Sequence, residues 1–178
     1  MFTSPHWHWK KTIVALLLLI ASAYVSVTLP ISEKGIPFTA QSLVVFYLAG
    51  MLLPSRTFVV IAGYLILGII GLPVFADGGS GWSKIVGASG GFLYGFLFSG
   101  MFIAMALWKE RLHSLGHIMI IMILGTVVLF VFGIGHLSYK FGFEKALEYG
   151  FHPFWKMALV KAILASLMVF WSNRSLFR

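Results

Sequence analysis

Apolar residues fill six long stretches of this chain, and polar residues gather in the short segments between them. The intervals without any Asp, Glu, Lys or Arg are 12–32, 35–55, 57–76, 85–108 and 112–139. Each is about as long as a membrane-spanning helix, which needs ~20 residues. A sixth apolar stretch, from Phe154 to Trp171, contains Lys156 and Lys161. The pattern predicts an all-α membrane protein with six transmembrane helices, at about 11–30, 38–54, 57–72, 86–108, 114–138 and 154–172.

Composition supports this prediction. The chain has 178 residues, of which 60% are hydrophobic and only 10% charged, whereas a soluble domain is about 25% charged. We expect one transmembrane domain over residues 1–178, with a short cytoplasmic tail at 1–10. The net charge of +8 is spread thinly between the apolar stretches, so no nucleic-acid partner is expected and the surroundings are membrane lipid.

The distribution of charge and of loop lengths predicts an orientation. An even number of spans places both termini on one side, and Lys and Arg are more frequent on that side, which predicts a multi-pass protein of the plasma (inner) membrane with both termini in the cytoplasm. The expected outer loops, 31–37, 73–85 and 139–153, are longer than the inner connections. A ligand would therefore meet the protein from outside.

One segment, from Gly68 to Phe96, combines many glycines with aromatic residues, an acid and a base. Glycine permits close backbone approach and positive φ, and a plain linker would not need the aromatics. The segment predicts a loop that covers a ligand, with polar groups directed inward from Asp77, Trp82, Ser89 and Tyr94. The alternative is an interfacial loop that Trp82 anchors at the level of the headgroups.

Lys161 is the strongest single candidate for a ligand-binding residue. It lies about seven residues into the last predicted helix, or roughly 10 Å below its outer end. A charge at that depth is costly and indicates function, here attraction of a carboxylate from a small anion. The alternative is an ammonium that snorkels to the headgroups. Thr39 and Gln41, at the start of the second predicted helix, are further candidates, although they would also serve as helix caps.

Several classes of chemistry find no support in the sequence. There is no Cys, which removes disulfides and Cys-type metal sites. No Ser-His-Asp grouping or paired carboxylates predict catalysis, so an enzyme is not expected, nor are a cofactor or a metal. No Gly-Lys-Ser/Thr ending marks a phosphate-binding loop, so energy for uphill transport would come from a partner.

Three separated motifs resemble those of one known family. Residues 37–42 read Pro-Phe-Thr-Ala-Gln-Ser, with Gly50 further on. Residues 71–96 read Gly-Leu-Pro-Val-Phe-Ala, then glycines, then Gly-Ala-Ser-Gly-Gly-Phe-Leu-Tyr-Gly-Phe. Residues 153–162 begin Pro-Phe and end Lys-Ala. Together they resemble the BioY family, the biotin-binding S components of energy-coupling factor transporters.

The resemblance implies a six-helix S-component fold that binds biotin from the outer face, between helices four to six and under the first and third connecting loops. It implies a coupling transmembrane subunit and two ATPase subunits as partners, with biotin as the transported ligand. The residues expected to bind biotin are Lys161 for its carboxylate, Asp77, Ser89 and Gln41 for its ureido ring, Phe75, Trp82, Phe92 and Tyr94 for its apolar body, and the motif residues Thr39, Gly90 and Gly91.

Two departures from the family pattern leave alternatives open. The family's Asp three residues before the last-helix Lys is Ala158 here, which leaves open another small carboxylate vitamin as the ligand. In the first helix, only Ser22 and Ser26 keep the small-residue spacing through which family members meet the coupling subunit, so the protein acting alone also stays open. A non-binding assembly subunit of a membrane complex is the alternative from a different class.

Overall fold

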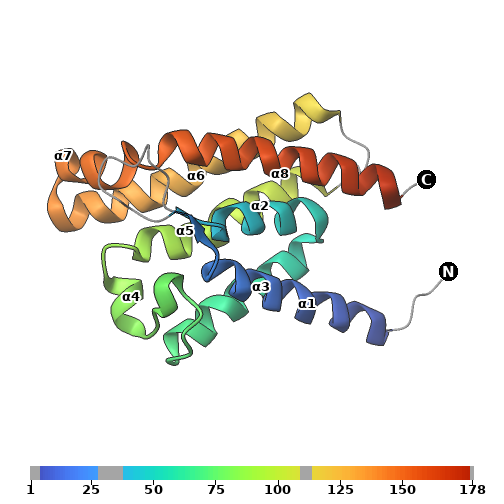
Figure 1. The fold of residues 1–178 in the computed structure, drawn as a ribbon, viewed down its shortest axis with the longest axis horizontal. Coiled ribbons are helices and arrows are strands. Elements are labelled where there is room, and N and C mark those ends of the chain that lie inside the picture. Colours follow the sequence, from blue (N-terminus) through green and yellow to red (C-terminus); the bar gives the residue numbers. More distant parts are fainter. Residues whose placement is uncertain (1–4, 28–37, 109–113, 177–178) are drawn as a thin grey trace.

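Six longer helices make up most of the part of the chain that the structure describes, residues 5–27, 38–108 and 114–176 of a computed structural model. They are α1 (Pro5–Ala23), α2 (Gln41–Met51), α3 (Pro54–Ile69), α5 (Gly90–Leu107), α6 (Leu115–Phe141) and α8 (Trp155–Leu176) (Figure 1). Short elements join them: the strands β1 (Ser26–Val27) and β2 (Phe38–Thr39), the 3-10 turn η1 (Ala76–Gly78), α4 (Trp82–Val86), α7 (Phe143–Ala146) and the π-helical turn η2 (Leu147–Phe151). The predicted all-α architecture is confirmed.

Three of the described helices are long and apolar enough to cross a membrane: Gly90–Leu107, Leu115–Phe141 and Trp155–Arg174. Gln41–Met51 and Pro54–Ile69 are also apolar but shorter. Together they make this a multi-pass membrane fold, while the count of six spans stays a prediction.

The predicted end of the first helix was wrong. It was expected to continue to residue 30, but α1 ends at Ala23 and the chain continues as the extended residues Ser26–Val27, which pair antiparallel with Phe38–Thr39. The reason is that Tyr24, Val25 and Val27 are aromatic or β-branched as well as apolar, and such residues favour extended backbone. For the same reason α2 begins at Gln41 rather than at residue 38.

The fourth predicted helix, 86–108, begins later in the structure than expected. The chain leaves α4 at Gly87, whose backbone is extended (φ −74°, ψ −175°), and begins α5 at Gly90. Part of the expected loop 73–85 is therefore helical. The expected loop 139–153 is largely helical as well, since α6 continues to Phe141 and α7 and η2 follow it.

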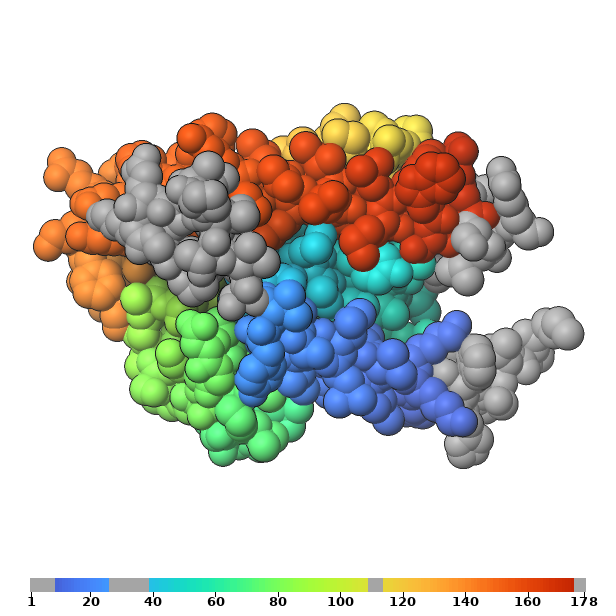
Figure 2. All heavy atoms as spheres, viewed as in Figure 1, coloured from blue at the N-terminus to red at the C-terminus, as the bar shows by residue number. Residues whose placement is uncertain are grey.

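Helix α2 occupies the middle of the bundle, in contact with α1, α5 and α8. Figure 2 shows it on one face between α1 and α8. Its residue Val45 belongs to a fully buried core with Leu19, Ile61, Ile103 and Met122. The start of α1 and the end of α8 lie at one end of the bundle, and α4 and α7 lie at the other (Figure 1). The helices thereby bring α4 and α7 to the same end of the bundle.

Helices α5 and α6 pack with their backbones nearly in contact. A Cβ added at Gly91 would lie 2.6 Å from the carbonyl oxygen of Phe132 and 3.0 Å from the Cα of Gly133. Only glycine permits so close an approach of two helices. The glycines at the start of α5 therefore set how near α6 lies to the short helix α4.

Candidate functional site

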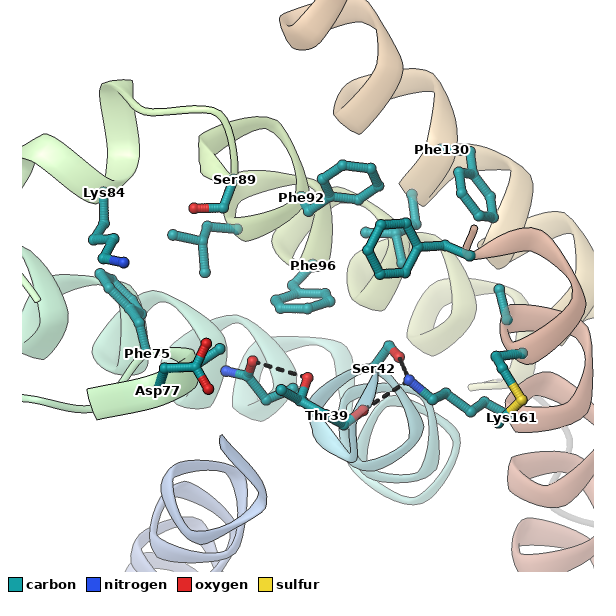
Figure 3. A pocket seen from close by; sticks show the side chains of 17 residues that line it. Thr39, Ser42, Phe75, Asp77, Lys84, Ser89, Phe92, Phe96, Phe130 and Lys161 are labelled. Carbon is teal, nitrogen blue, oxygen red and sulfur yellow. Dashed lines mark hydrogen bonds between the residues drawn. The ribbon is translucent and has the colours of Figure 1, made fainter. Parts of the chain in front are cut away.

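A cavity of about 310 Å³ lies where the first turns of α2, α5 and α8 meet η1, α4 and α6 (Figure 3). Its polar lining residues are Thr39, Gln41, Ser42, Asp77, Lys84, Ser89 and Lys161. Its apolar lining residues are Phe75, Ala76, Phe92, Leu93, Phe96, Leu129, Phe130, Phe154, Met157 and Ala158. Small-molecule sites have this composition, mostly apolar with a few placed polar groups, and volumes from about 300 Å³ upward.

Lys161 marks one side of the cavity. Its ammonium nitrogen donates hydrogen bonds to the carbonyl oxygen of Thr39 at 2.7 Å and to the hydroxyl of Ser42 at 3.3 Å. Both acceptors are neutral, so the positive charge of Lys161 is not cancelled by either of them. Ala158, one turn earlier on the same helix, also lines the cavity and contributes only a methyl group. The half-buried ammonium is thus available to an anionic group of a ligand.

Gln41 is fixed in the cavity wall by partners on both sides of its amide. Its Oε1 accepts a hydrogen bond from the hydroxyl of Thr39 at 3.3 Å, and its Nε2 donates to the hydroxyl of Tyr64. Tyr64 is fully buried, and its ring meets that of Phe75 edge-on, with centroids 5.4 Å apart. The expected alternative, a helix cap, does not apply, because α2 has no side-chain cap hydrogen bond at its start. The network instead orients the amide that faces the cavity.

Asp77 reaches the cavity from a tight turn. Its φ of 57° is in the left-handed region, as is that of Gly78 at 67°, a conformation that Asp and Asn tolerate better than other side chains. The turn is closed by a hydrogen bond from the Phe75 amide to the Gly79 carbonyl at 3.0 Å. Lys84 approaches the same side of the cavity from α4, and Figure 3 shows both side chains away from Lys161.

Aromatic rings separate these two polar sides. Phe92 lies against Phe130 at a centroid distance of 6.2 Å, edge-on, and against Phe154 at 6.3 Å. Phe96 faces the middle of the cavity from one turn further along α5 (Figure 3). The site can therefore hold a molecule with an apolar body between two polar ends.

Seven of the eleven residues predicted to bind a ligand line this one cavity: Thr39, Gln41, Phe75, Asp77, Ser89, Phe92 and Lys161. The other four, Gly90, Gly91, Trp82 and Tyr94, lie outside its lining. Gly90 and Gly91 are buried at the start of α5, and Trp82 is 62% exposed. Tyr94 is hydrogen-bonded to His136 of α6 at 2.8 Å. The first expected covering loop, 31–37, lies outside the described residues.

Several lining residues were not among the predicted site residues, notably Ser42, Lys84, Phe130, Phe154 and Met157. Three of them carried a signal in the sequence: Ser42 directly follows Gln41, Lys84 is the base of the glycine-rich segment, and Phe154 belongs to the Pro-Phe motif at residues 153–154. Phe130 carried none, because an aromatic residue that faces lipid and one that faces a cavity occur in the same kind of apolar stretch.

Comparison with known proteins places the chain in a family. The model of the BioY family matches residues 7–177. "Biotin transporter BioY2" of Lactococcus lactis subsp. cremoris is 35% identical over 89% of this chain and 87% of its own length. "Biotin transporter BioY" of Thermotoga maritima is 32% identical over 85% and 86%. The fold is similar to the solved S-component for biotin from an ECF-type ABC transporter, with a TM-score of 0.77, 19% identity, and coverage of 99% of this chain and 96% of that one. This chain belongs to the BioY family.

Proposed function

We propose that this chain is the membrane-embedded, biotin-binding subunit of an energy-coupling factor type importer. The observation that carries the proposal is the cavity in which the Lys161 ammonium, bonded only to neutral acceptors among the described residues, faces a wall of aromatic rings. The family's relatives described as biotin transporters support biotin as the ligand. Biotin has a carboxylate, an apolar body and a ureido ring, the three parts that the lining can hold.

The lining favours one orientation of biotin. A carboxylate at Lys161 would gain a charge-assisted hydrogen bond, which contributes about 1.5–3 kcal/mol when buried. The ureido ring, which both donates and accepts hydrogen bonds, would then lie near Asp77, Gln41 and Ser89. Phe92 and its aromatic neighbours would contact the apolar body. The reverse orientation, with the carboxylate at Lys84, is the alternative that the second experiment below separates.

The proposal extends to the surroundings of the protein. The whole chain, residues 1–178, would act as one domain with both termini in the cytoplasm. The cavity lies away from the start of α1 and the end of α8, so it would open to the outer face. A coupling transmembrane subunit and two ATPases would supply the energy, since the sequence has no phosphate-binding loop of its own.

A calorimetric titration of the purified protein in nanodiscs with biotin tests the proposal. We expect saturable binding with one site. Folded protein that shows no heat of binding would reject it. Ala158 motivates a second candidate ligand, another small carboxylate vitamin. The same titration is therefore carried out with lipoate and with pantothenate. A lower dissociation constant for either of them than for biotin would replace biotin as the ligand.

A second titration decides the orientation of the ligand. Biotinamide lacks the negative charge of biotin and should bind the wild type more weakly. The Lys residue that contacts the carboxylate is the one whose replacement by Met removes this preference. We expect Lys161→Met to abolish it and Lys84→Met to retain it, and the opposite result would reverse the orientation of biotin.

A further inference from the structure

Two side chains of α6 hold the end of α4 from outside the cavity. The His136 Nε2 atom is 2.8 Å from the carbonyl oxygen of Gly87, and the Lys140 ammonium donates to the carbonyl of Val86 at 2.5 Å. His136 and Lys140 are four residues apart and so lie on one face of α6. Neither lines the cavity. Their shared target is the pair of carbonyl groups at which α4 ends.

The hydrogen bonds of His136 fix its ring. A carbonyl can only accept, so Nε2 carries the proton that it donates to Gly87, and Nδ1 of the neutral ring is then an acceptor. The hydroxyl of Tyr94, on α5, lies 2.8 Å from that Nδ1 and donates to it. The two rings also meet edge-on at a centroid distance of 5.7 Å. His136 thus links α5 to the end of α4.

Helix α4 depends on such support. It has only five residues, lies between Gly81 and Gly87, and has no buried residue. A helix this short is not stable by itself, and the carbonyls of its last turn lack partners within the helix. It supplies Lys84 to the cavity, and Ser89 lies three residues after its last residue, Val86. Whatever fixes the carbonyls of Val86 and Gly87 therefore fixes two polar lining residues.

The glycines of α5 allow this arrangement. A Cβ added at Gly91 would lie 2.5 Å from the Cβ of His136, and one at Gly90 would lie 3.4 Å from its Nε2. The lack of side chains lets α6 approach until His136 reaches the break between α4 and α5. Gly90, Gly91 and Tyr94, which do not line the cavity, contribute to the site through this contact.

We propose that Tyr94, His136 and Lys140 are positioning residues that form a latch on α4, and that the latch sets how fast ligand enters and leaves the cavity. The inference rests on the proposed binding function and adds the residues that govern its kinetics. With the latch closed, Lys84 and Ser89 stay at the cavity. When it opens, α4 moves away from α6 and uncovers the ligand.

The motion of α4 can be measured directly because the chain has no cysteine. Ser83, exposed on α4, is changed to Cys and carries a spin label as the only thiol adduct. We expect His136→Phe to increase the mobility of this label and Tyr94→Phe to increase it less. His136→Gln, which keeps a donor for Gly87, should restore much of the wild-type spectrum. Lys145→Met, at an exposed lysine on α7, is the control for Lys140→Met and should change nothing.

Stopped-flow measurement of biotin release completes the test. We expect His136→Phe and Lys140→Met each to speed release by about threefold to tenfold, the effect of one lost hydrogen bond. Unchanged release and label mobility in Lys140→Met, whose side chain is exposed and should not affect folding, together with unchanged values in His136→Phe, would overturn the latch. If the wild type binds no biotin, the proposed function fails, and label mobility alone decides whether the latch exists.

Discussion

Lys161 of α8 is hydrogen-bonded to the main-chain carbonyl of Thr39, a residue 122 positions earlier, at 2.7 Å. The bond joins the last helix to the segment that leads into α2, and both residues line the cavity. Because the acceptor belongs to the backbone, side-chain substitution at residue 39 would not remove it. The ammonium is therefore held at the cavity wall in a geometry that the fold itself defines.

Replacing this ammonium should weaken ligand binding. We expect Lys161→Met to raise the dissociation constant of biotin about tenfold to a hundredfold, the range for a lost charge-assisted hydrogen bond. Calorimetric titration measures it. Lys156→Met is the matched control, since Lys156 is exposed on the same helix and lies over the ring of Trp155. Equal affinities of the two variants would remove Lys161 from the binding site.

Adding an acid at Ala158 should compete with an anionic ligand. Ala158→Asp places a carboxylate three residues before Lys161, on the same face of α8. We expect biotin to bind about twofold to fivefold more weakly, since partly exposed ion pairs contribute about 0.2–1 kcal/mol. Ala158→Asn adds the same bulk without charge and serves as the control. If Ala158→Asp binds biotin more tightly than Ala158→Asn, the new acid contacts the ureido ring rather than Lys161.

Removing the Tyr64 hydroxyl should destabilise the fold and loosen Gln41. Tyr64→Phe leaves the buried Gln41 amide without the partner of its Nε2, at a cost of about 1–3 kcal/mol. We expect a lower thermal unfolding midpoint and weaker biotin binding. Tyr139→Phe is the control, because Tyr139 is 92% exposed. An unfolding midpoint as high as that of the control would show that the hydroxyl contributes nothing to stability.

Two glycines should respond oppositely to alanine. Gly91→Ala forces a methyl group against the α6 backbone and should destabilise the protein by about 1–3 kcal/mol, as overpacking does. Gly135→Ala meets no atom within 4 Å and should stabilise α6 by up to about 1 kcal/mol. Thermal unfolding in the same detergent compares them. A midpoint for Gly91→Ala at or above the wild-type value would contradict the close packing of α5 on α6.

The sequence was sufficient to identify polar residues of the site. It was not sufficient to show which way an apolar side chain points from its helix. Lys161 stood out because a charge inside an apolar stretch is rare, and the structure places it at the cavity. Asp77 and Ser89 stood out as polar groups in a glycine-rich segment whose aromatic residues a plain linker would not need. Phe130 could not be recognised, since nothing in an apolar helix tells which of its faces meets lipid and which meets a cavity.

The sequence also did not predict correctly where some helices begin and end. Hydropathy alone did not show that α1 ends at Ala23, because Val25 and Val27 are as apolar as the helix before them and differ only in backbone preference. Tyr94 was expected to contact the ligand because it belongs to the glycine-rich motif. Its hydrogen bond to His136, which lies 42 positions further along the chain, depends on the approach of α6.

The contact between Lys161 and Thr39 also bears on the synthesis of the protein. A growing chain that has inserted every helix up to α6 still lacks Met157, Ala158 and Lys161, and with them one wall of the cavity. The ligand site comes into being only when the final helix enters the bilayer and docks beside α2. Binding of free, radiolabelled biotin would therefore distinguish fully inserted molecules from truncated or arrested ones, and free vitamin would act as a folding ligand only at the last step of biogenesis.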